Sequence, residues 1–364
     1  MAPNSDRGAA LHDSHSCPSR WRLMASTAVL LASALLVTSC AAGAPANRSE
    51  TGELTATLGS GAVSMNYTVP QLMSSTGLDR RNGVTVDYRP VGTSSTNLVA
   101  GVLSGDLTFA NPAITTAIDA VDRGSPLVFV ACTNYAANTL ALRNDVIERI
   151  GVEPDAPARE RVAALRGLTI ATSAEGSGNN NILRTIIRSY GMNPDTDVRI
   201  IGVQDTSAIV GGVKQGQFDG AFYGAGVTEQ NIAAGEASLW LSLPRGDVRD
   251  TIGDSLAGAL VVRRDLLERD PDLVDAMFDA TVAAQRLIAD DPAAAGAELR
   301  TRWFPDLDQQ VFDLAWQQAR SSFPQDGRCT RTSIDQLLDQ MRTTTGGAYS
   351  GVDYDELVYA RAKG

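Results

Sequence analysis

One pattern restricts the fold of this chain more than any other: short apolar segments alternate with amphipathic ones, and polar, Gly-containing loops separate them. The pattern recurs three times within residues 54–131. Strands that alternate with helices form a mostly parallel sheet covered by helices on both faces. We therefore predict a doubly wound α/β lobe, in which ligands bind beyond the carboxyl ends of the strands.

The predicted elements of this lobe follow from the period of the apolar residues. Strands are expected at residues 54–59, 83–89, 107–110 and 127–131, and helices at 69–75, 98–103 and 113–121. The segment at 127–131 is apolar throughout, which is typical of a strand buried on both faces of a parallel sheet.

The pattern begins again after a polar stretch at residues 144–161. Strands are predicted at 165–172, 198–203 and 221–223, and helices at 182–190 and 208–214. A strand at 257–263 would return to the first lobe, and the rest of the chain has a helical pattern. We therefore expect two lobes with a central ligand cleft. Lobe 1 would comprise residues 53–138 and 256–364, with the helical C-terminal part, and lobe 2 residues 139–255.

The N-terminal residues 1–39 have the pattern of an export signal. Trp21 and Arg22 precede an apolar core, and small residues lead to Cys40. The sequence at 37–40, VTSC, resembles a bacterial lipobox, which implies cleavage before Cys40 and lipidation of its sulfur. A plain signal peptide or a transmembrane anchor is the alternative, although the core is short for a span of about 20 residues. Residues 40–52 are small and polar, as in a flexible tether.

The few histidines limit the chemistry of the mature chain. His12 and His15 are the only two, and both belong to the predicted signal. Without them the chain has no Ser-His or Cys-His nucleophile and no imidazole metal ligand. The net charge of −11 argues against a nucleic-acid partner. We expect a binding protein without enzymatic activity, metal or cofactor.

The cysteines agree with export. Beyond Cys17 and Cys40, only Cys132 and Cys329 remain, without the spacing of a zinc site. In an exported protein two such thiols can form a disulfide. Two buried, unpaired thiols are the alternative.

Three segments carry a resemblance to a known family. Residues 77–86 (GLDRRNGVTV), 165–171 (LRGLTIA) and 216–221 (GQFDGA) resemble passages of the solute-binding proteins of ABC transporters in the nitrate/sulfonate/taurine class. The similarity covers about residues 54–290. It implies a type II periplasmic-binding-protein fold and a lipid-anchored, extracytoplasmic, monomeric receptor. Such a receptor captures a small organic solute and delivers it to a permease with its ATPase.

Other functions remain open. Residues 92–97 (GTSSTN) partly resemble the TAXI-type receptors of tripartite transporters. A pyrimidine-synthase-like enzyme on the same fold is another alternative, but that class needs a Lys and a reactive His in its site. A sensory or structural lipoprotein, with a partner domain in the cleft, is a third.

The candidate ligand-binding residues lie in loops that follow the predicted strands. They are Ser60, Ser64, Asn66, Thr93, Ser94, Ser95, Asn111, Ser173, Ser177, Gly178, Asn179, Thr206 and Tyr223. Three of the loops precede helices, whose N-terminal N–H groups bind polar acceptors. For each Ser and Thr the alternative is helix capping without ligand contact. These loops contain no Lys or Arg, so we expect a neutral or weakly charged solute.

Overall fold

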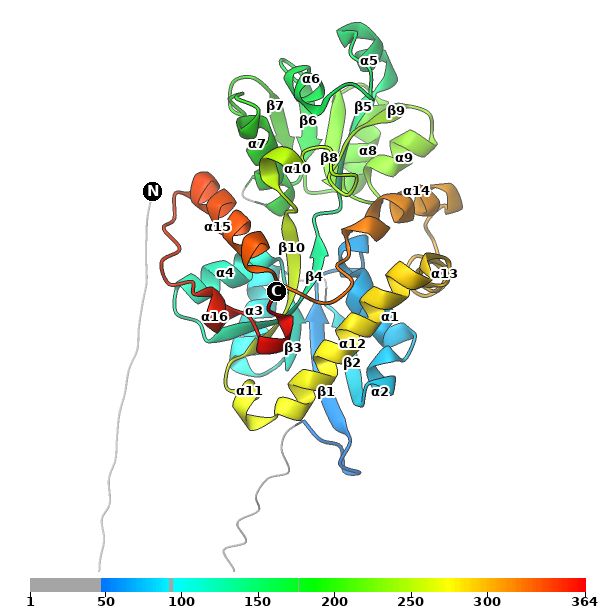
Figure 1. Ribbon diagram of the computed structural model, residues 1–364. Helices are drawn as coiled ribbons and strands as arrows, with labels where there is room; N and C mark the ends of the chain where they lie inside the picture. The colour runs from blue at the N-terminus through cyan, green and yellow to red at the C-terminus, as the bar shows by residue number, and fades with distance from the viewer. Residues whose placement is uncertain (1–46, 92–93, 176) are drawn as a thin grey trace, which may run out of the picture. The chain divides into compact units, whose positions relative to one another are not determined.

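The computed structural model describes residues 47–91, 94–175 and 177–364 (Figure 1). The predicted signal sequence, the lipidation site Cys40, the first part of the tether and Thr93 lie outside the described residues. The residues from 47 on belong to one compact unit. In the described ranges, none of the helices combines the length and the apolar character that crossing a membrane requires.

The first sheet has the strand order β2-β1-β3-β10-β4. Its strands are β1 (Leu54–Ser60), β2 (Val84–Pro90), β3 (Phe109–Asn111), β4 (Leu127–Tyr135) and β10 (Leu256–Arg263). β1 runs parallel to both β2 and β3, whereas β10 pairs antiparallel with β3 and β4. The connecting helices are α1 (Thr68–Ser75), α2 (Leu78–Arg81), α3 (Ser95–Ser104) and α4 (Ile114–Asp122).

The position of β4 differs from the sequence prediction. Its residues are buried as expected, but β4 is the last strand in the order and pairs antiparallel with β10. The C-terminal segment covers its outer edge: Val358 bridges Phe129, and the Tyr359 N–H donates to the Phe129 carbonyl at 2.9 Å. The apolar run at 127–131 therefore lies between β10 and the C-terminal segment, and not between two neighbouring parallel strands.

The second sheet repeats this arrangement with the order β7-β6-β8-β5-β9. Its strands are β5 (Asn138–Arg143), β6 (Thr169–Thr172), β7 (Arg199–Gly202), β8 (Gly220–Gly224) and β9 (Ala237–Ser242). β6 is parallel to β7 and β8, and β5 is antiparallel to β8 and β9. Each sheet thus has three parallel strands followed by one strand of opposite direction and an edge strand. The predicted fold class of two α/β lobes is confirmed.

The helices around the second sheet are α5 (Asn144–Ile150), α6 (Ala158–Ala163), α7 (Gly178–Ser189), α8 (Thr206–Lys214), α9 (Thr228–Ala233) and α10 (Arg249–Ile252). α7 follows the predicted pattern, because its apolar residues Leu183, Ile186 and Ile187 are all fully buried. The chain leaves this helix through Gly191, whose φ of 81° favours glycine.

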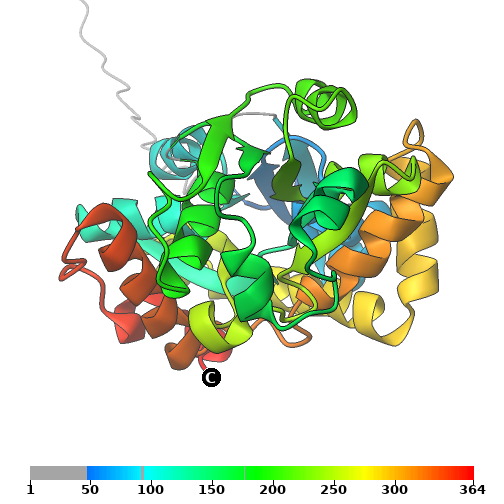
Figure 2. The ribbon, with the colours of Figure 1, turned by 90° about the horizontal axis from the view of Figure 1, so that it is seen from above.

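The C-terminal part is helical, as predicted. Its elements are α11 (Leu266–Arg269), α12 (Pro271–Asp290), α13 (Pro292–Arg302), α14 (Gln309–Ala319), η2 (Arg320–Ser322), α15 (Arg331–Thr345), α16 (Tyr354–Leu357) and η3 (Ala360–Ala362). We expected this whole segment to remain with the first lobe. α12 does pack against α1 and α2, but α14 packs against α9 beside the second sheet (Figure 2). A hydrogen bond from the Ser242 hydroxyl to the Gln318 side chain, 2.8 Å long, fixes this contact.

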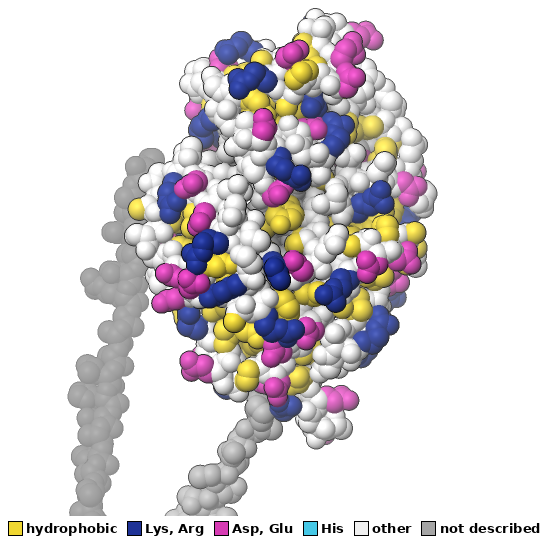
Figure 3. Space-filling model, viewed as in Figure 1, with side chains coloured by type: hydrophobic (Ala, Val, Ile, Leu, Met, Phe, Trp, Pro, Cys, Tyr) yellow, Lys and Arg dark blue, Asp and Glu magenta, His cyan; other side chains and the backbone are white. Residues whose placement is uncertain are grey.

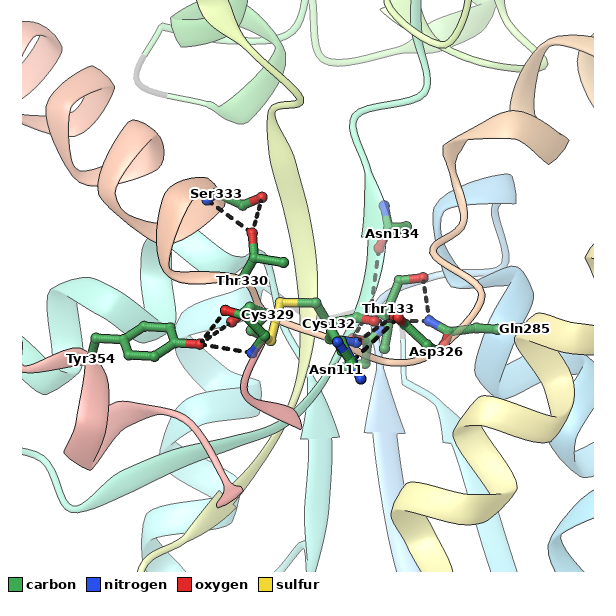
Figure 4. The surroundings of a disulfide bond; sticks show 12 residues. Asn111, Cys132, Thr133, Asn134, Gln285, Asp326, Cys329, Thr330, Ser333 and Tyr354 are labelled. Carbon is green, nitrogen blue, oxygen red and sulfur yellow. Dashed lines mark hydrogen bonds and ion pairs between the residues drawn. A yellow bond between two sulfur atoms is a disulfide. The ribbon is translucent and has the colours of Figure 1, made fainter. Parts of the chain in front are cut away.

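A disulfide joins Cys132 in β4 to Cys329, which lies between η2 and α15 (Figure 4). Both cysteines are fully buried. The Cys132 N–H also donates to the carbonyl of Gly327 at 2.9 Å. The bond therefore fastens the chain to the first sheet at the point where it returns from the contact of α14 with α9.

Candidate functional site

Two predicted residues lie side by side at the carboxyl edge of the first sheet. Ser60 ends β1 and Asn111 ends β3, and their Cα atoms are register partners in the parallel pair. Both side chains are buried. The arrangement follows from parallel pairing, which brings the ends of neighbouring strands to one edge.

Two tyrosines hold the loop that follows β1. The Ser60 Oγ lies 2.7 Å from the hydroxyl of Tyr88, which comes from β2. The Tyr67 hydroxyl forms a hydrogen bond with the backbone of Gly61, and burial raises its pKa. Burial also raises the pKa of Tyr88, by more than the Ser60 hydrogen bond lowers it. Both phenols therefore stay protonated at neutral pH, and each can donate one hydrogen bond.

Asn111 faces the core of the first lobe. Its Oδ1 accepts a hydrogen bond of 2.9 Å from the Thr133 hydroxyl, while its Nδ2 is buried without a partner among the described residues. Asn111 and Thr133 line a cavity of about 10 Å³ together with Val69 of α1 and Thr281 of α12. That volume suits about one water molecule and no organic solute. Asn111 thus binds Thr133 inside the first lobe, where the cavity has no room for a solute.

Several predicted hydroxyls are helix caps. Ser94 precedes α3 and accepts a hydrogen bond from the Asn97 N–H at 3.3 Å. Ser177 caps α7 in the same way, with 3.4 Å to the Asn180 N–H. The Ser95 hydroxyl is not a cap: it accepts from the Ala113 N–H at 2.9 Å and so joins the start of α3 to the residue before α4. The capping alternative therefore describes the local role of Ser94 and Ser177.

The carboxyl edge of the second sheet carries the other predicted residues. Ser173 follows β6 and contacts the hydroxyl of Ser177, and Asn179 accepts a hydrogen bond of 2.8 Å from the Asn138 side chain. Gly178 is the exposed first residue of α7, and Thr206 is the half-buried first residue of α8. Tyr223 in β8 is half-buried, and burial raises its pKa.

Asn66 connects the two edges. It lies in η1 (Met65–Tyr67), the short helix that Ser64 precedes. A Cβ atom built on Gly224, at the end of β8, would lie 3.6 Å from the Asn66 Nδ2. The predicted loop after β1 therefore reaches the end of a strand in the other sheet.

The acidic residues near these loops differ in their surroundings. Glu175 is 89% exposed, and Asp205 caps α8 by accepting from the Ser207 N–H. Glu229, in contrast, is buried and accepts hydrogen bonds from the Thr139 hydroxyl at 3.1 Å and the Gly226 N–H at 2.7 Å. Burial raises the pKa of Glu229. Its carboxyl group is thus held inside the second lobe and is not a solvated loop charge.

Tyr88, Thr133 and Asn138 contact the predicted residues but were not among those expected from the sequence. Tyr88 shares the inner face of β2 with the buried Val84 and Val86, and a Tyr at the end of such a strand usually finds a partner for its hydroxyl. The alternation in β2 therefore provides a local signal from which Tyr88 could have been predicted as a hydrogen-bond partner. Asn138 opens a strand that the sequence analysis did not assign, so its position had no local signal.

The described candidates are Ser, Thr, Asn, Tyr and Gly residues, which bind by hydrogen bonds and carry no formal charge. In the part of the chain that the structure describes, no group of three or more His, Cys, Asp or Glu residues could hold a metal ion. The arrangement suits reversible binding of a polar molecule.

Solved structures with a similar fold come from several organisms. The periplasmic aliphatic sulphonate binding protein SsuA of Escherichia coli aligns with a TM-score of 0.63 and 13% identity, over 84% of this chain and 92% of its own. The periplasmic nitrate-binding protein NrtA of Synechocystis has a TM-score of 0.51 and 18% identity, over 72% and 68% of the two chains. A Candida albicans protein with the generic periplasmic binding protein fold has a TM-score of 0.57 and 11% identity, over 84% and 96%.

At these identities the structures establish the fold and nothing finer. A search of the curated proteins finds no match by sequence. A sequence model of one protein family, described as NMT1-like, matches residues 51–299. This range is more than half of the 364 residues and includes both sheets. The chain belongs to the NMT1-like family.

Proposed function

We propose that this protein is an extracytoplasmic solute-binding protein that captures a small organic solute between two lobes and delivers it to an ABC permease, without altering it. In this proposal lobe 1 is built on the first sheet and lobe 2 on the second. The observation that carries it is the repeated sheet topology, because it puts polar side chains at the carboxyl ends of corresponding strands. Family membership and the names of the similar structures support it.

We further propose that the solute is neutral or weakly charged. The loops at residues 60–66, 94–97 and 173–179 contain no Lys or Arg. The hydroxyls of Tyr67 and Tyr88 stay protonated and uncharged. Glu175, in the third of these loops, places a carboxylate there, with Arg184 of α7 at 4.0 Å as its partner, and this carboxylate disfavours an anion. The expected solute thus differs in charge from the anions for which the similar structures are named, nitrate and sulphonate.

Thermal unfolding tests both statements. The purified protein is screened against amino acids, sulfonates, pyrimidines and polyamines. An uncharged member should raise the melting temperature with a saturable dependence on its concentration. A protein indifferent to the whole panel would contradict the receptor function. A response to sulfonates alone would contradict only the neutral solute.

A pair of variants then locates the solute. Asn66→Ala should weaken the response, because Asn66 lies between the two edges. Asp291→Ala is the control: it removes the N-cap of α13 at an exposed residue outside the predicted site, and should lower stability without changing the affinity. Equal effects of the two variants on affinity would argue against the proposed position.

We also propose that Cys40 carries the lipid anchor and that the receptor acts as a monomer. Val37-Thr38-Ser39-Cys40 supports the anchor, as set out from the sequence. Replacing Cys40 with Ser should move the protein from the membrane fraction to the soluble fraction. Cys17→Ser, in the predicted signal, is the matched control and should leave the distribution unchanged. Membrane retention of the Cys40→Ser protein would refute lipidation at this residue.

A further inference from the structure

The segment that leads from the end of β8 into α9 reaches the first lobe. Gly224 lies opposite Asn66, and the Ala225 N–H donates to the carbonyl of Ala137, in the link between the sheets, at 3.0 Å. Ala225 also packs against the hydrophobic cluster of the first sheet and its helices. We call residues 224–227 the contact loop, because they belong to the second lobe and touch the first.

Two helices next to the contact loop meet the first lobe at the same place. α14 packs against α9 and also against η1, which contains Asn66. On the face shown in Figure 3, the atoms around the first sheet, in the lower part, and those around the second sheet, in the upper part, form one continuous surface. The two lobes are therefore in contact in this structure, and the conformation of the contact loop limits how closely Gly224 and Asn66 approach.

The side chain of Glu229 fixes the backbone of the contact loop. Its Oε2 accepts a hydrogen bond of 2.7 Å from the Gly226 N–H, and the Gln230 side chain donates to the Gly226 carbonyl at 3.0 Å. The φ of Gly226 is 103°, a conformation that residues with a side chain rarely adopt. Both polar groups of the Gly226 backbone are thus held by side chains from the first turn of α9.

The other oxygen of Glu229 connects the contact loop to β5. Oε1 accepts a hydrogen bond of 3.1 Å from the hydroxyl of Thr139, and this hydroxyl is also bonded to that of Thr228. Thr139 is the register partner of Tyr223, which is one of the predicted site residues. One carboxyl group therefore links the contact loop, the start of α9 and the strand beside Tyr223.

The burial of this network makes its hydrogen bonds decisive. Glu229 and Thr228 are 1% exposed, and Thr139 is fully buried. Moving a carboxyl group out of water costs free energy, and hydrogen bonds to the group reduce that cost. One of these bonds comes from the Gly226 N–H. The carboxyl group of Glu229 therefore favours the conformation of the contact loop that supplies this N–H.

We propose that Glu229 is a positioning residue of the solute site: it holds the contact loop in the conformation that meets Asn66 and the first lobe. The inference rests on the proposed function, because it gives the contact between the lobes a role in solute capture. The buried side chain of Glu229 does not itself touch the solute. It acts through the backbone of Gly226 and the hydroxyl of Thr139.

Hydrogen exchange of the protein without solute tests the positioning. In Glu229→Met the amides of Ala225 and Gly226 should exchange at least tenfold faster, because the carboxyl group no longer holds the contact loop. Glu229→Gln should restore slow exchange, since its Oε1 can accept from Gly226 and its Nε2 can donate to Thr139. An equal increase throughout the second lobe would show a purely structural role and overturn the inference. Should Glu229→Met fail to fold, Glu229→Asp, which withdraws the carboxyl group by one methylene, takes its place.

Asn231→Leu is the matched control. Asn231 is buried in the same helix, but its side chain donates to the carbonyl of Val210 and to Glu236, and not to the contact loop. The variant should lower stability and leave the exchange of the contact loop unchanged. Equally fast exchange of the contact loop in Asn231→Leu and Glu229→Met would overturn the inference.

X-ray scattering of the same proteins measures the consequence for the two lobes. Glu229→Met should have a larger radius of gyration than Asn231→Leu, and Glu229→Gln should match the unchanged protein. An unchanged radius for Glu229→Met would overturn the inference even if its contact loop exchanges faster. Neither measurement uses a solute. A protein that fails the thermal screen but shows these changes contradicts the receptor function alone, and the reverse result contradicts only the role of Glu229.

Discussion

Asn66 and Gly224 lie against each other, although Asn66 follows a strand of the first sheet and Gly224 ends a strand of the second. The Asn66 amide nitrogen is 3.6 Å from the position that a Cβ on Gly224 would occupy, and among the described residues beyond Gly224 and its two chain neighbours no other heavy atom lies within 4 Å of that position. This distance is an ordinary van der Waals contact. The residue at 224 therefore decides how closely the loop after β1 can approach the end of β8.

A larger side chain at position 224 should keep the two edges apart. Gly224→Val adds branched atoms where Asn66 lies, and we expect at least a tenfold loss of solute affinity with an increased radius of gyration in X-ray scattering. Gly224→Ala is the matched control, because its Cβ fits at 3.6 Å. If the Val variant binds as tightly as the Ala variant, the contact does not limit closure.

Removing the Tyr88 hydroxyl at the edge of the first sheet should cost little stability. In Tyr88→Phe the Ser60 hydroxyl keeps its bond to the Gly61 carbonyl, so we expect a loss of about 1 kcal/mol in the free energy of unfolding, measured in urea. Tyr190→Phe is the control, since its hydroxyl bonds the exposed Asp250 side chain. A loss above about 3 kcal/mol for Tyr88→Phe would point to damage beyond one hydrogen bond.

Reduction of the disulfide should destabilise the fold substantially. Cys132 and Cys329 are 197 residues apart, and chain entropy alone gives roughly 5 kcal/mol for a loop of that size. We expect a loss of about 2–5 kcal/mol on reduction, measured by denaturant unfolding. The Cys132→Ala/Cys329→Ala protein should show the same lower stability with and without reductant. An unchanged stability of the reduced protein would contradict a structural role.

The buried carboxyl of Glu229 should make stability depend on pH. Its pKa in the folded protein is raised above the ordinary value of 4.5 by burial. The folded state then holds the proton more tightly than the unfolded state, so this stabilising contribution is complete below pH 4.5 and is lost as pH rises through the folded pKa.

Urea midpoints between pH 4 and 8 measure this loss. Glu229→Gln should flatten the profile, because glutamine does not titrate. Glu175→Gln serves as the control, since the Glu175 side chain is 89% exposed and should leave the slope unchanged. A Glu229→Gln profile parallel to that of the unchanged protein would contradict the assignment.

The local spacing of apolar residues was sufficient to predict an element where one helix or strand packs against one hydrophobic core. α7 is an example, because the spacing of Leu183, Ile186 and Ile187 specifies its buried face without reference to any other element. The strands β5 and β9 lacked such a signal. β5 pairs antiparallel with both β8 and β9 inside the second sheet, so the assignment of these strands depends on distant partners.

The candidate site divides in the same way. Ser60 and Asn111 could be placed at one edge from the sequence, since parallel strands end together. Their actual partners, Tyr88 and Thr133, lie 28 and 22 residues away along the chain, and no local pattern connects them. Ser94 and Ser177 accept hydrogen bonds from N–H groups three residues further along the chain. Their capping role could therefore be predicted from the sequence, as the alternative to ligand contact.

The sequence by itself determined that this is an α/β chain of two similar halves whose two histidines both lie within the first 15 residues, because periodicity and composition can be read along the chain. Only the tertiary structure decided that the C-terminal segment covers β4, that α14 reaches the second sheet, and that Asn66 meets Gly224. These contacts join residues far apart in the chain, and their formation depends on the packing of all elements together.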